Sequence, residues 1–342
     1  CSVPFARRGA MTSTVDSVRE DGVGPISAES IVGKSPRELA WARMSRDKVS
    51  LFALGVIITY LLVAALAPVI CSVLGISPYA LDGNSLNDYG LPKGSFGGIS
   101  SEHWLGVEPG TGRDIFARLI YGARASLLVG ILATILTTAI GLVIGVVAGY
   151  KRGWVDSIIG RFMDVTLAFP SFLLIIALTR PFTQRLESLG VPEGNPARMT
   201  YIILVLATFG WVYVARVVRG QTLSLREREF VEAAKASGAT SRHIVFKQLL
   251  PNLWAPVIVI VSLSLPGYVA TESTLSFLGL GLMQPAASWG VMLGDSVRYY
   301  RADPTYLFIP GIALVVLVMA FNIVGDAVRD ALDPKADRQN LL

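Results

Sequence analysis

Residues Ala125–Tyr150 read ASLLVGILATILTTAIGLVIGVVAGY and contain no charged side chain. An α-helix rises about 1.5 Å per residue, so about 20 apolar residues cross a hydrocarbon core that is about 30 Å thick. This stretch is longer than that minimum. It therefore predicts a helix that spans a membrane.

The composition of the whole chain supports this interpretation. Of its 342 residues, 52% are hydrophobic and only 16% are charged, and the mean hydropathy is +0.55. Soluble domains have less apolar and more charged compositions. The sequence thus predicts an all-α membrane protein.

Five other windows have the length and the low charge of a membrane span. The third of the six windows contains Arg161 and Asp164, and the fifth ends beside Glu272. In chain order the six predicted spans are Val49–Cys71, Ala125–Tyr150, Ser157–Thr179, Met199–Ala215, Leu253–Thr271 and Thr305–Gly325.

Lys and Arg residues indicate the orientation, because cytoplasmic segments keep an excess of them. Placing both termini in the cytoplasm puts most of the 30 Lys and Arg residues on that side. The loop between the fourth and fifth spans is then cytoplasmic, and the net charge of +5 reflects this bias rather than a nucleic-acid surface. Cytoplasmic tails are expected over 1–48, which is predicted to be partly disordered, and over 329–342.

Few residues suggest chemistry on the chain itself. His103 and His243 fall in different aqueous segments, so neither a metal site nor a Ser/His arrangement has its parts. Gly33-Lys34-Ser35 is like the end of a phosphate-binding loop, but Ala28 stands where that loop needs a glycine. We expect no catalytic residue, no metal and no cofactor on this chain.

The cytoplasmic loop between the fourth and fifth spans reads as two short helices around a glycine turn. Ser224 and Glu227 have the spacing of a capping box, which predicts that a helix begins there. Gly238 suits the left-handed position that ends a helix. A second helix is expected over 241–250, where Pro251 would break it. The narrow apolar face of the first helix would consist of Phe230, Val231, Ala234 and Ser237.

This loop has two physical interpretations. Its alanines and glycine would let another protein approach the backbone closely, and Arg228, Glu232 and Lys235 could form ion pairs across that interface. Alternatively, an amphipathic helix of this composition could rest on lipid headgroups. The residue pattern alone leaves both open.

The spacing within the loop carries a resemblance to a known family. Glu232-Ala233-Ala234, then Gly238, then Leu250-Pro251 ending thirteen residues after that glycine resembles the EAA loop of binding-protein-dependent ABC importer permeases. That loop also lies in the cytoplasm between two spans. Gln248 departs from the isoleucine that the family favours.

Four further segments narrow the resemblance to the oligopeptide, dipeptide and nickel branch of these permeases. They are His103–Gly106, Gly112–Arg124, Glu272–Gly281 and Ser288–Gly290. A first span followed by a longer outer segment also resembles the "C" type subunit of these importers.

The resemblance implies a fold, a function and partners. The chain would have the ABC type I importer permease fold and form half of a translocation pathway in the bacterial cytoplasmic membrane. Its partners would be a second, related permease subunit, two cytoplasmic ATPase subunits that bind ATP and Mg, and an extracytoplasmic peptide-binding protein. The residues that couple to the ATPase would be Glu232, Ala233, Ala234, Gly238, Leu250 and Pro251.

Alternatives to a peptide importer differ in cargo or in energy source. Nickel or another small solute could replace the peptide, although no Met, His or Cys cluster lies in the spans. A secondary transporter would need its own ion-coupling site and usually a pair of repeats, and only Glu272 is a candidate for such a site. A membrane-embedded enzyme would need catalytic residues at facing depths.

Several residues in the spans have predicted mechanical roles. Gly141, Gly145 and Gly149 repeat every four residues, so they would form one face for close helix packing. Pro170 and Pro266 would each remove a backbone hydrogen bond and bend a helix. We also consider these two prolines and Glu272 as candidate pathway or gate residues.

Glu272 has two interpretations, because a charge in mid-bilayer is costly. It could line the pathway and meet the amino group of a peptide, or it could lie near the outer interface and fix the loop that follows the fifth span.

The outer segment 72–124 divides into two parts. The pattern over Arg113–Arg124 predicts an amphipathic helix on the outer surface. The stretch 72–101 has no periodicity and is either a solvated loop or a contact for the binding protein. The permease core is then expected over 125–328, with its EAA-type loop over 221–252.

Overall fold

The computed structural model describes residues 47–332, and this part of the chain contains helices and no β-strand. Nearly all of the two predicted tails lies outside the described residues. The long helices are α2 (Lys48–Leu74), α3 (Ile115–Lys151), α4 (Gly153–Ala168), α5 (Ser171–Ser188), α6 (Asn195–Leu225), α9 (Leu250–Phe277) and α11 (Thr305–Leu332). The short helices are α7 (Glu229–Ala236), α8 (Ser241–His243) and α10 (Trp289–Ser296), with a 3₁₀ turn at Gly83–Ser85.

Five helical segments are long and apolar enough to cross a membrane, and one bent pair of helices would make a sixth. Four of the five are α2, α3, α6 and α11, and the fifth is the continuous segment Ser241–Phe277, which contains α9. The prediction of an all-α membrane protein is therefore confirmed.

The bent pair is the third predicted span. α4 and α5 meet at an angle of 82° around Pro170. A proline disfavours helical backbone at the residue before it, and Phe169 is extended, with φ −76° and ψ 134°. Proline also has no N–H to continue the hydrogen-bond ladder. The expected bend in this span is thus a full break. Pro266, by contrast, is buried within α9, which continues past it.

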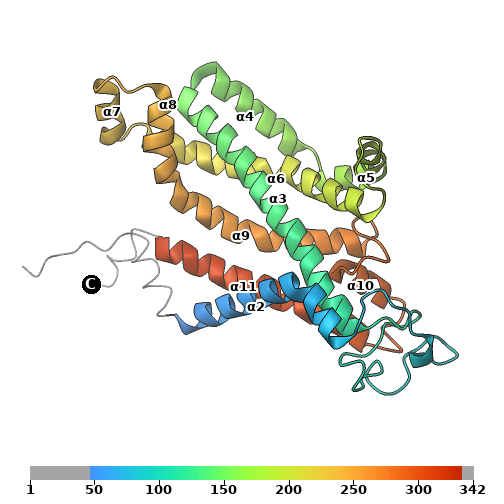
Figure 1. Cartoon of the computed structure of the whole chain (residues 1–342). Helices are drawn as coiled ribbons and strands as arrows, with labels where there is room; N and C mark the ends of the chain where they lie inside the picture. Colours follow the sequence, from blue (N-terminus) through green and yellow to red (C-terminus); the bar gives the residue numbers. More distant parts are fainter. Residues whose placement is uncertain (1–46, 333–342) are drawn as a thin grey trace, which may run out of the picture.

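α3 runs the length of the helix bundle and contacts most of the other long helices (Figure 1). Gly141, Gly145 and Gly149 lie on its α6 side. A Cβ atom added at Gly145 would stand 2.7 Å from the carbonyl oxygen of Ala215 in α6. The other two glycines are equally close to α6. The glycine repeat therefore lets the two backbones approach closely.

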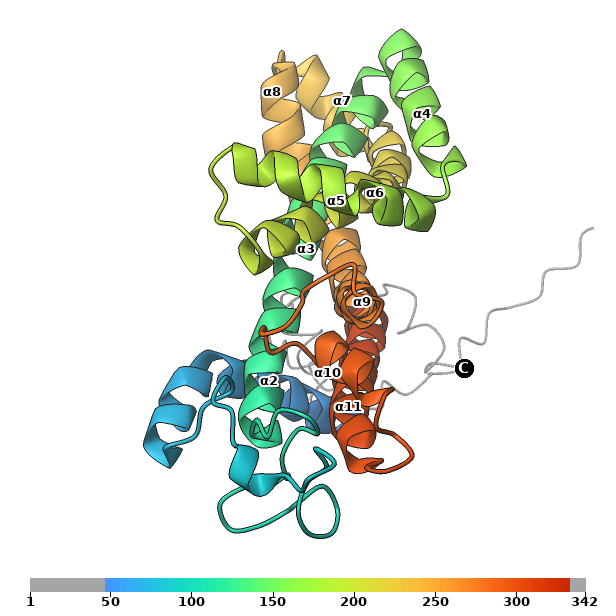
Figure 2. The same ribbon diagram turned by 90° about the vertical axis from the view of Figure 1, so that its right-hand side faces the viewer.

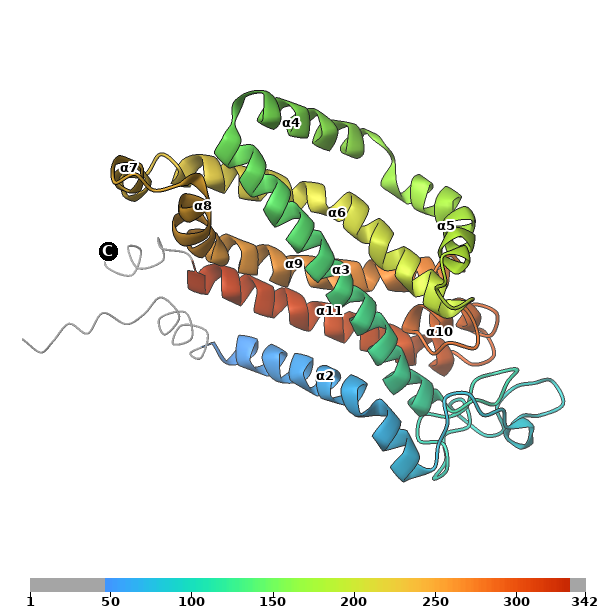
Figure 3. The same ribbon diagram turned by 45° about the horizontal axis from the view of Figure 1, so that its top comes forward.

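The remaining helices are arranged around this pair. α2 lies beside α11, and α9 lies between α11 and α6 (Figure 3). α4 and α5 flank α6 on the side away from α2 and α11 (Figure 2). One end of the bundle carries α7 together with the beginning of α2 and the end of α11, and we call it the loop end. The opposite end carries α10 and the segment 75–114, and we call it the distal end.

The stretch Arg113–Arg124 is helical from Ile115 on, as expected, but it is not a separate surface helix. These residues form the first turns of α3, which begins at Ile115 and continues without a break to Lys151. Arg118, expected on the polar outer side, is fully buried. Its guanidinium lies 3.5 Å from the Glu108 carboxylate and also faces backbone carbonyl groups. Asp114 and Arg118 of this stretch are thus buried and paired inside the fold, whereas Arg124 at its end is exposed.

Candidate functional site

The loop between α6 and α9 carries α7 as a short helix outside the bundle (Figure 1). The predicted capping box is wrong, because Ser224 still belongs to α6, which runs to Leu225. The N–H of Arg226 donates to the carbonyl of Thr222 and so continues the hydrogen bonds of α6 past Ser224. Glu227 instead pairs with Arg152 at the end of α3. α7 begins at Glu229 without a side-chain cap.

Arg226 fixes the beginning of this loop to the bundle. Its Nη1 donates to the backbone carbonyl of Tyr150 at 2.5 Å, and its guanidinium lies 5.8 Å from the centre of the Tyr150 ring. A hydrogen bond from a charged donor is stronger than one between neutral groups, and a guanidinium is also attracted to the face of an aromatic ring. The chain therefore leaves α6 in a defined direction.

α7 has one buried side chain and an exposed outer face. Val231 is fully buried and packs with Ile244 and Leu249, which follow α8. The predicted apolar face is narrower than expected, because Phe230 is 39% exposed and Ser237 is exposed. Ala234 is half-buried. We call the exposed residues Glu232, Ala233, Lys235 and Ala236 the α7 outer face; Glu229 and Phe230 at the start of α7 are also exposed.

Gly238 ends α7 in the left-handed conformation, with φ +80°. The N–H of Gly238 donates to the Lys235 carbonyl, and the N–H of Ala239 donates to the Ala234 carbonyl. Such a turn favours glycine, because a Cβ atom is strained at positive φ. Apart from its two chain neighbours, no described residue has an atom within 4 Å of the place where that Cβ would stand. The backbone conformation, not packing within the chain, is therefore what requires a glycine here.

The second predicted helix of the loop does not end at Pro251. The helix runs on from Ser241 to Phe277, and Ile244–Leu249 form a π-helical stretch. Within it the N–H of Leu250 donates to the carbonyl of Val245, five residues back. Pro251 then stands at the first turn of α9, where proline is tolerated. The site residue Leu250 is half-buried here, and Pro251 is exposed.

Glu272 lies near the other end of α9 and is fully buried. Its carboxylate accepts hydrogen bonds from Ser126 of α3 at 2.6 Å, from Ser276 at 2.8 Å and from Ser288 at 3.0 Å. Ser288 directly precedes α10. The carboxylate thus joins α3, α9 and the loop to α10, and it is fully buried among the described residues.

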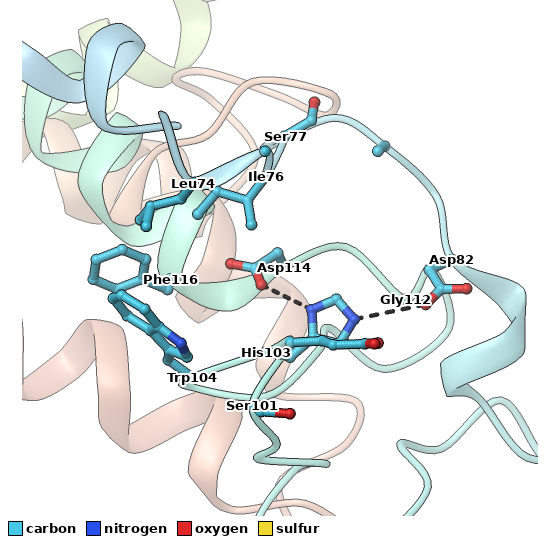
Figure 4. Close-up of a pocket in the computed structure, with 13 residues that line it drawn as sticks. Leu74, Ile76, Ser77, Asp82, Ser101, His103, Trp104, Gly112, Asp114 and Phe116 are labelled. Carbon is cyan, nitrogen blue, oxygen red and sulfur yellow. Dashed lines mark hydrogen bonds and ion pairs between the residues drawn. The ribbon is translucent and has the colours of Figure 1, made fainter. Parts of the chain in front are cut away.

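At the distal end, His103 connects two of the segments that resemble the permease family, His103–Gly106 and Gly112–Arg124 (Figure 4). Its Nδ1 lies 2.8 Å from Asp114, which caps α3, and its Nε2 lies 3.6 Å from Asp82. Hydrogen bonds from the Ser85 hydroxyl and the Asn84 N–H lower the pKa of Asp82. These groups line a cavity of about 410 Å³ whose other wall is apolar. The residues around Asp114 are therefore packed, while most of the stretch 75–101 is exposed.

Sequence reasoning missed a second polar cluster at the distal end. Glu108 is buried, and its carboxylate accepts a hydrogen bond from the hydroxyl of Tyr306 at 2.5 Å while facing Arg118 at 3.5 Å. The three residues tie the segment 75–114 to α3 and α11. Glu108 stands beside the turn residues Pro109 and Gly110, a context that predicts exposure, so the sequence held no signal for its burial.

Comparisons with known proteins agree with this geometry. Residues 141–338 match the family described as "Binding-protein-dependent transport system inner membrane component". Residues 35–91 match the "N-terminal TM domain of oligopeptide transport permease C".

Individual relatives cover nearly all of the chain. It is 36% identical to the dipeptide transport system permease protein DppC of Alkalihalophilus pseudofirmus over 301 residues, which are 88% of this chain and 90% of the relative. It is 37% identical to the oligopeptide transport system permease protein OppC of Escherichia coli K12 over 305 residues, or 89% and 93% of the two chains.

Among solved structures, an inward-facing form of the MetNI methionine ABC transporter contains a chain of the same fold. The TM-score is 0.51 at 21% identity, and the match covers 64% of this chain and 98% of the other. The family match covers more than half of the chain and includes the α7 loop and α9. The chain therefore belongs to the family of binding-protein-dependent transport system inner membrane components.

Proposed function

We propose that this chain is a permease subunit of an ATP-driven peptide importer, and that α7 is the helix through which ATPase subunits move it. The observation that carries the proposal is the two-sided character of α7. One side is packed on the π-helical stretch Ile244–Leu249 through Val231, and the other is an exposed face of small and charged residues.

The α7 outer face has the properties of a docking surface. Ala233 and Ala236 have short side chains, so a partner can approach the backbone closely. Glu232 and Lys235 form no ion pair with any residue between 47 and 332, and they can pair with charges on a partner. ATP is bound and hydrolysed on the partner subunits, and this chain converts their movement into a movement of its spans.

The complete transporter would contain a second homologous permease subunit, two cytoplasmic ATPase subunits and an extracytoplasmic peptide-binding protein. The chain would lie in the bacterial cytoplasmic membrane with the loop end and both termini in the cytoplasm. Relatives named for dipeptide and oligopeptide transport support a peptide cargo. The buried Glu272 would hold helices together rather than line the pathway.

Uptake by the complete complex in vesicles tests the function. Labelled dipeptides and oligopeptides, delivered with the binding protein, should accumulate only when hydrolysable ATP is present on the ATPase side. Uptake that persists without ATP, or without the ATPase subunits, would contradict the proposal. Uptake of nickel ions in place of peptides would keep the ATP-driven importer and change its cargo.

Cysteine crosslinking tests the docking of α7. In a chain whose two natural cysteines are replaced by alanine, Ala233→Cys places a thiol on the α7 outer face, and it should crosslink to an ATPase subunit. Ala80→Cys, exposed at the distal end, is the matched control and should not crosslink. If a water-soluble maleimide labels Ala233→Cys in the assembled complex as fast as in the free permease, α7 is not the docked helix.

A further inference from the structure

Arg124 is a charged residue at the edge of a membrane span, and it has no partner among the described residues. It immediately precedes the uncharged run Ala125–Tyr150 of α3. Its side chain is exposed, and it makes no hydrogen bond or ion pair with any residue between 47 and 332. A guanidinium at this level is expected at the boundary between lipid headgroups and the hydrocarbon core.

The surroundings of Arg124 form a shallow, open hollow. A cavity of about 360 Å³ lies between α3, the beginning of α6 and the loop before α10. Tyr79 and Tyr121 stand in its lining, with their ring centres 6.1 Å apart. Neither tyrosine hydroxyl forms a hydrogen bond within the described chain, so both can donate to a ligand. The opposite wall, which includes Met199 and Leu282, is apolar.

An apolar track leads from this hollow along α3 toward the middle of the span. Leu128 lines the cavity, and Leu132 and Ile135 follow it at helical spacing. Their side chains are 39%, 43% and 59% exposed. Residues at such spacing lie one above another on the same side of a helix. An anion-binding group at the headgroup level therefore continues directly into a surface suited to an acyl chain.

The larger distal cavity, beside His103, does not offer the same opportunity. His103 and the carboxylates of Asp82 and Asp114 already satisfy one another there. In the hollow beside α3, the guanidinium and both hydroxyl groups are left for a ligand. Planar guanidinium groups bind phosphate oxygens in a bidentate manner, and tyrosine favours the membrane interface.

We propose that this hollow binds an acidic phospholipid, with its phosphate on Arg124 and an acyl chain along Leu128, Leu132 and Ile135. The lipid belongs to the leaflet at the distal end and fills the space between α3 and the beginning of α6. This site does not depend on the cargo or on ATP, so it stands or falls separately from the proposed function.

Lipid retention by the complete transporter tests the site. The complex is reconstituted in vesicles with equal amounts of phosphatidylglycerol and phosphatidylcholine, extracted in mild detergent, and analysed by native mass spectrometry. The wild-type complex should retain phosphatidylglycerol in preference to phosphatidylcholine. Arg124→Gln should lower this retention roughly tenfold, the effect of losing one charge-assisted hydrogen bond. Arg301→Gln, in an exposed loop at the same end, is the matched control and should behave like the wild type.

Four outcomes would overturn the proposal. The first is equal retention of both lipids by the wild type, and the second is equal retention of phosphatidylglycerol by wild type and Arg124→Gln. The third is displacement of the lipid by millimolar inorganic phosphate or dipeptide, which would make the hollow a site for free anions. If Arg124→Gln does not assemble, Arg124→Lys replaces it, because it keeps the charge and loses the planar fork. Wild-type retention by Arg124→Lys is then the fourth contrary outcome.

Discussion

Val231→Ala is expected to loosen α7 from the rest of the chain. The Val231 side chain is fully buried against Ile244 and Leu249, and the substitution removes two of its carbon atoms. At about 0.8 kcal/mol for each buried group of this size, the loss is about 1.6 kcal/mol before any cavity is counted. Because about 1.4 kcal/mol corresponds to a factor of ten, the open state of α7 should become roughly ten to twenty times more populated.

Amide hydrogen exchange on the permease pair, before ATPase subunits are added, measures this opening directly. The amides of α7 should exchange roughly tenfold faster in Val231→Ala, and those of α11 should not change. Phe230→Ala is the matched control, because it removes a larger side chain from the neighbouring position, which is 39% exposed. Unchanged protection of α7 in Val231→Ala would refute the reasoning, and so would an equal rise in Phe230→Ala.

Three further substitutions test other parts of the structure. Gly145→Ala places a Cβ 2.7 Å from a carbonyl oxygen of α6 and should destabilise the complex by about 1–3 kcal/mol, seen as a lower melting temperature. Gly160→Ala, where nothing lies within 4 Å, should not lower it. Glu272→Ala leaves four buried serine hydroxyls without their acceptor and should reduce the amount of assembled complex. Normal assembly with lost transport would instead assign Glu272 to the pathway. The pKa of Asp82 is lower in the folded chain than in the unfolded chain, where it is about 3.9, so the ionised carboxylate stabilises the fold above that pH. This contribution is lost as the pH falls through the folded pKa. Asp82→Asn should therefore make the melting temperature depend less on pH on the acid side.

Hydrophobic windows predicted the spans well because membrane insertion depends on length and charge, which the sequence displays directly. Backbone irregularities were harder to predict. Pro170 and Pro251 are both prolines within apolar helical stretches, yet α4 and α5 break at the first, while the helix continues through the second. Pro251 follows the π-helical stretch Ile244–Leu249, and this stretch packs against Val231 of α7. A rule that considers only the residues next to a proline cannot include a contact with a residue as distant in the chain as Val231.

The candidate site was predictable in position but not in its packing. The EAA-type spacing and the Lys and Arg bias located the loop, and the left-handed turn at Gly238 followed from local backbone preferences. The orientation of α7 could not be predicted from local preferences, because Val231 is buried against Ile244 and Leu249, which lie more than ten residues later in the chain. Likewise, Glu108 of the segment 75–114 and Arg118 of α3 are buried together as a pair. A charged side chain considered by itself is expected to be exposed, so neither residue signals this burial.

In the proposed function, one helix connects the two ends of the chain. Val231 packs on Leu249 at the beginning of the continuous helical segment Ser241–Phe277, and Glu272 lies near its other end. A displacement of α7 therefore moves α9, and the hydrogen bonds of Glu272 require Ser126 of α3 and Ser288 before α10 to follow. Since α3 also lies against α6 through its glycine repeat, most of the bundle shares this movement. In this proposal Glu272 would contribute to coupling through rigidity, although it lies at the end of the bundle opposite α7.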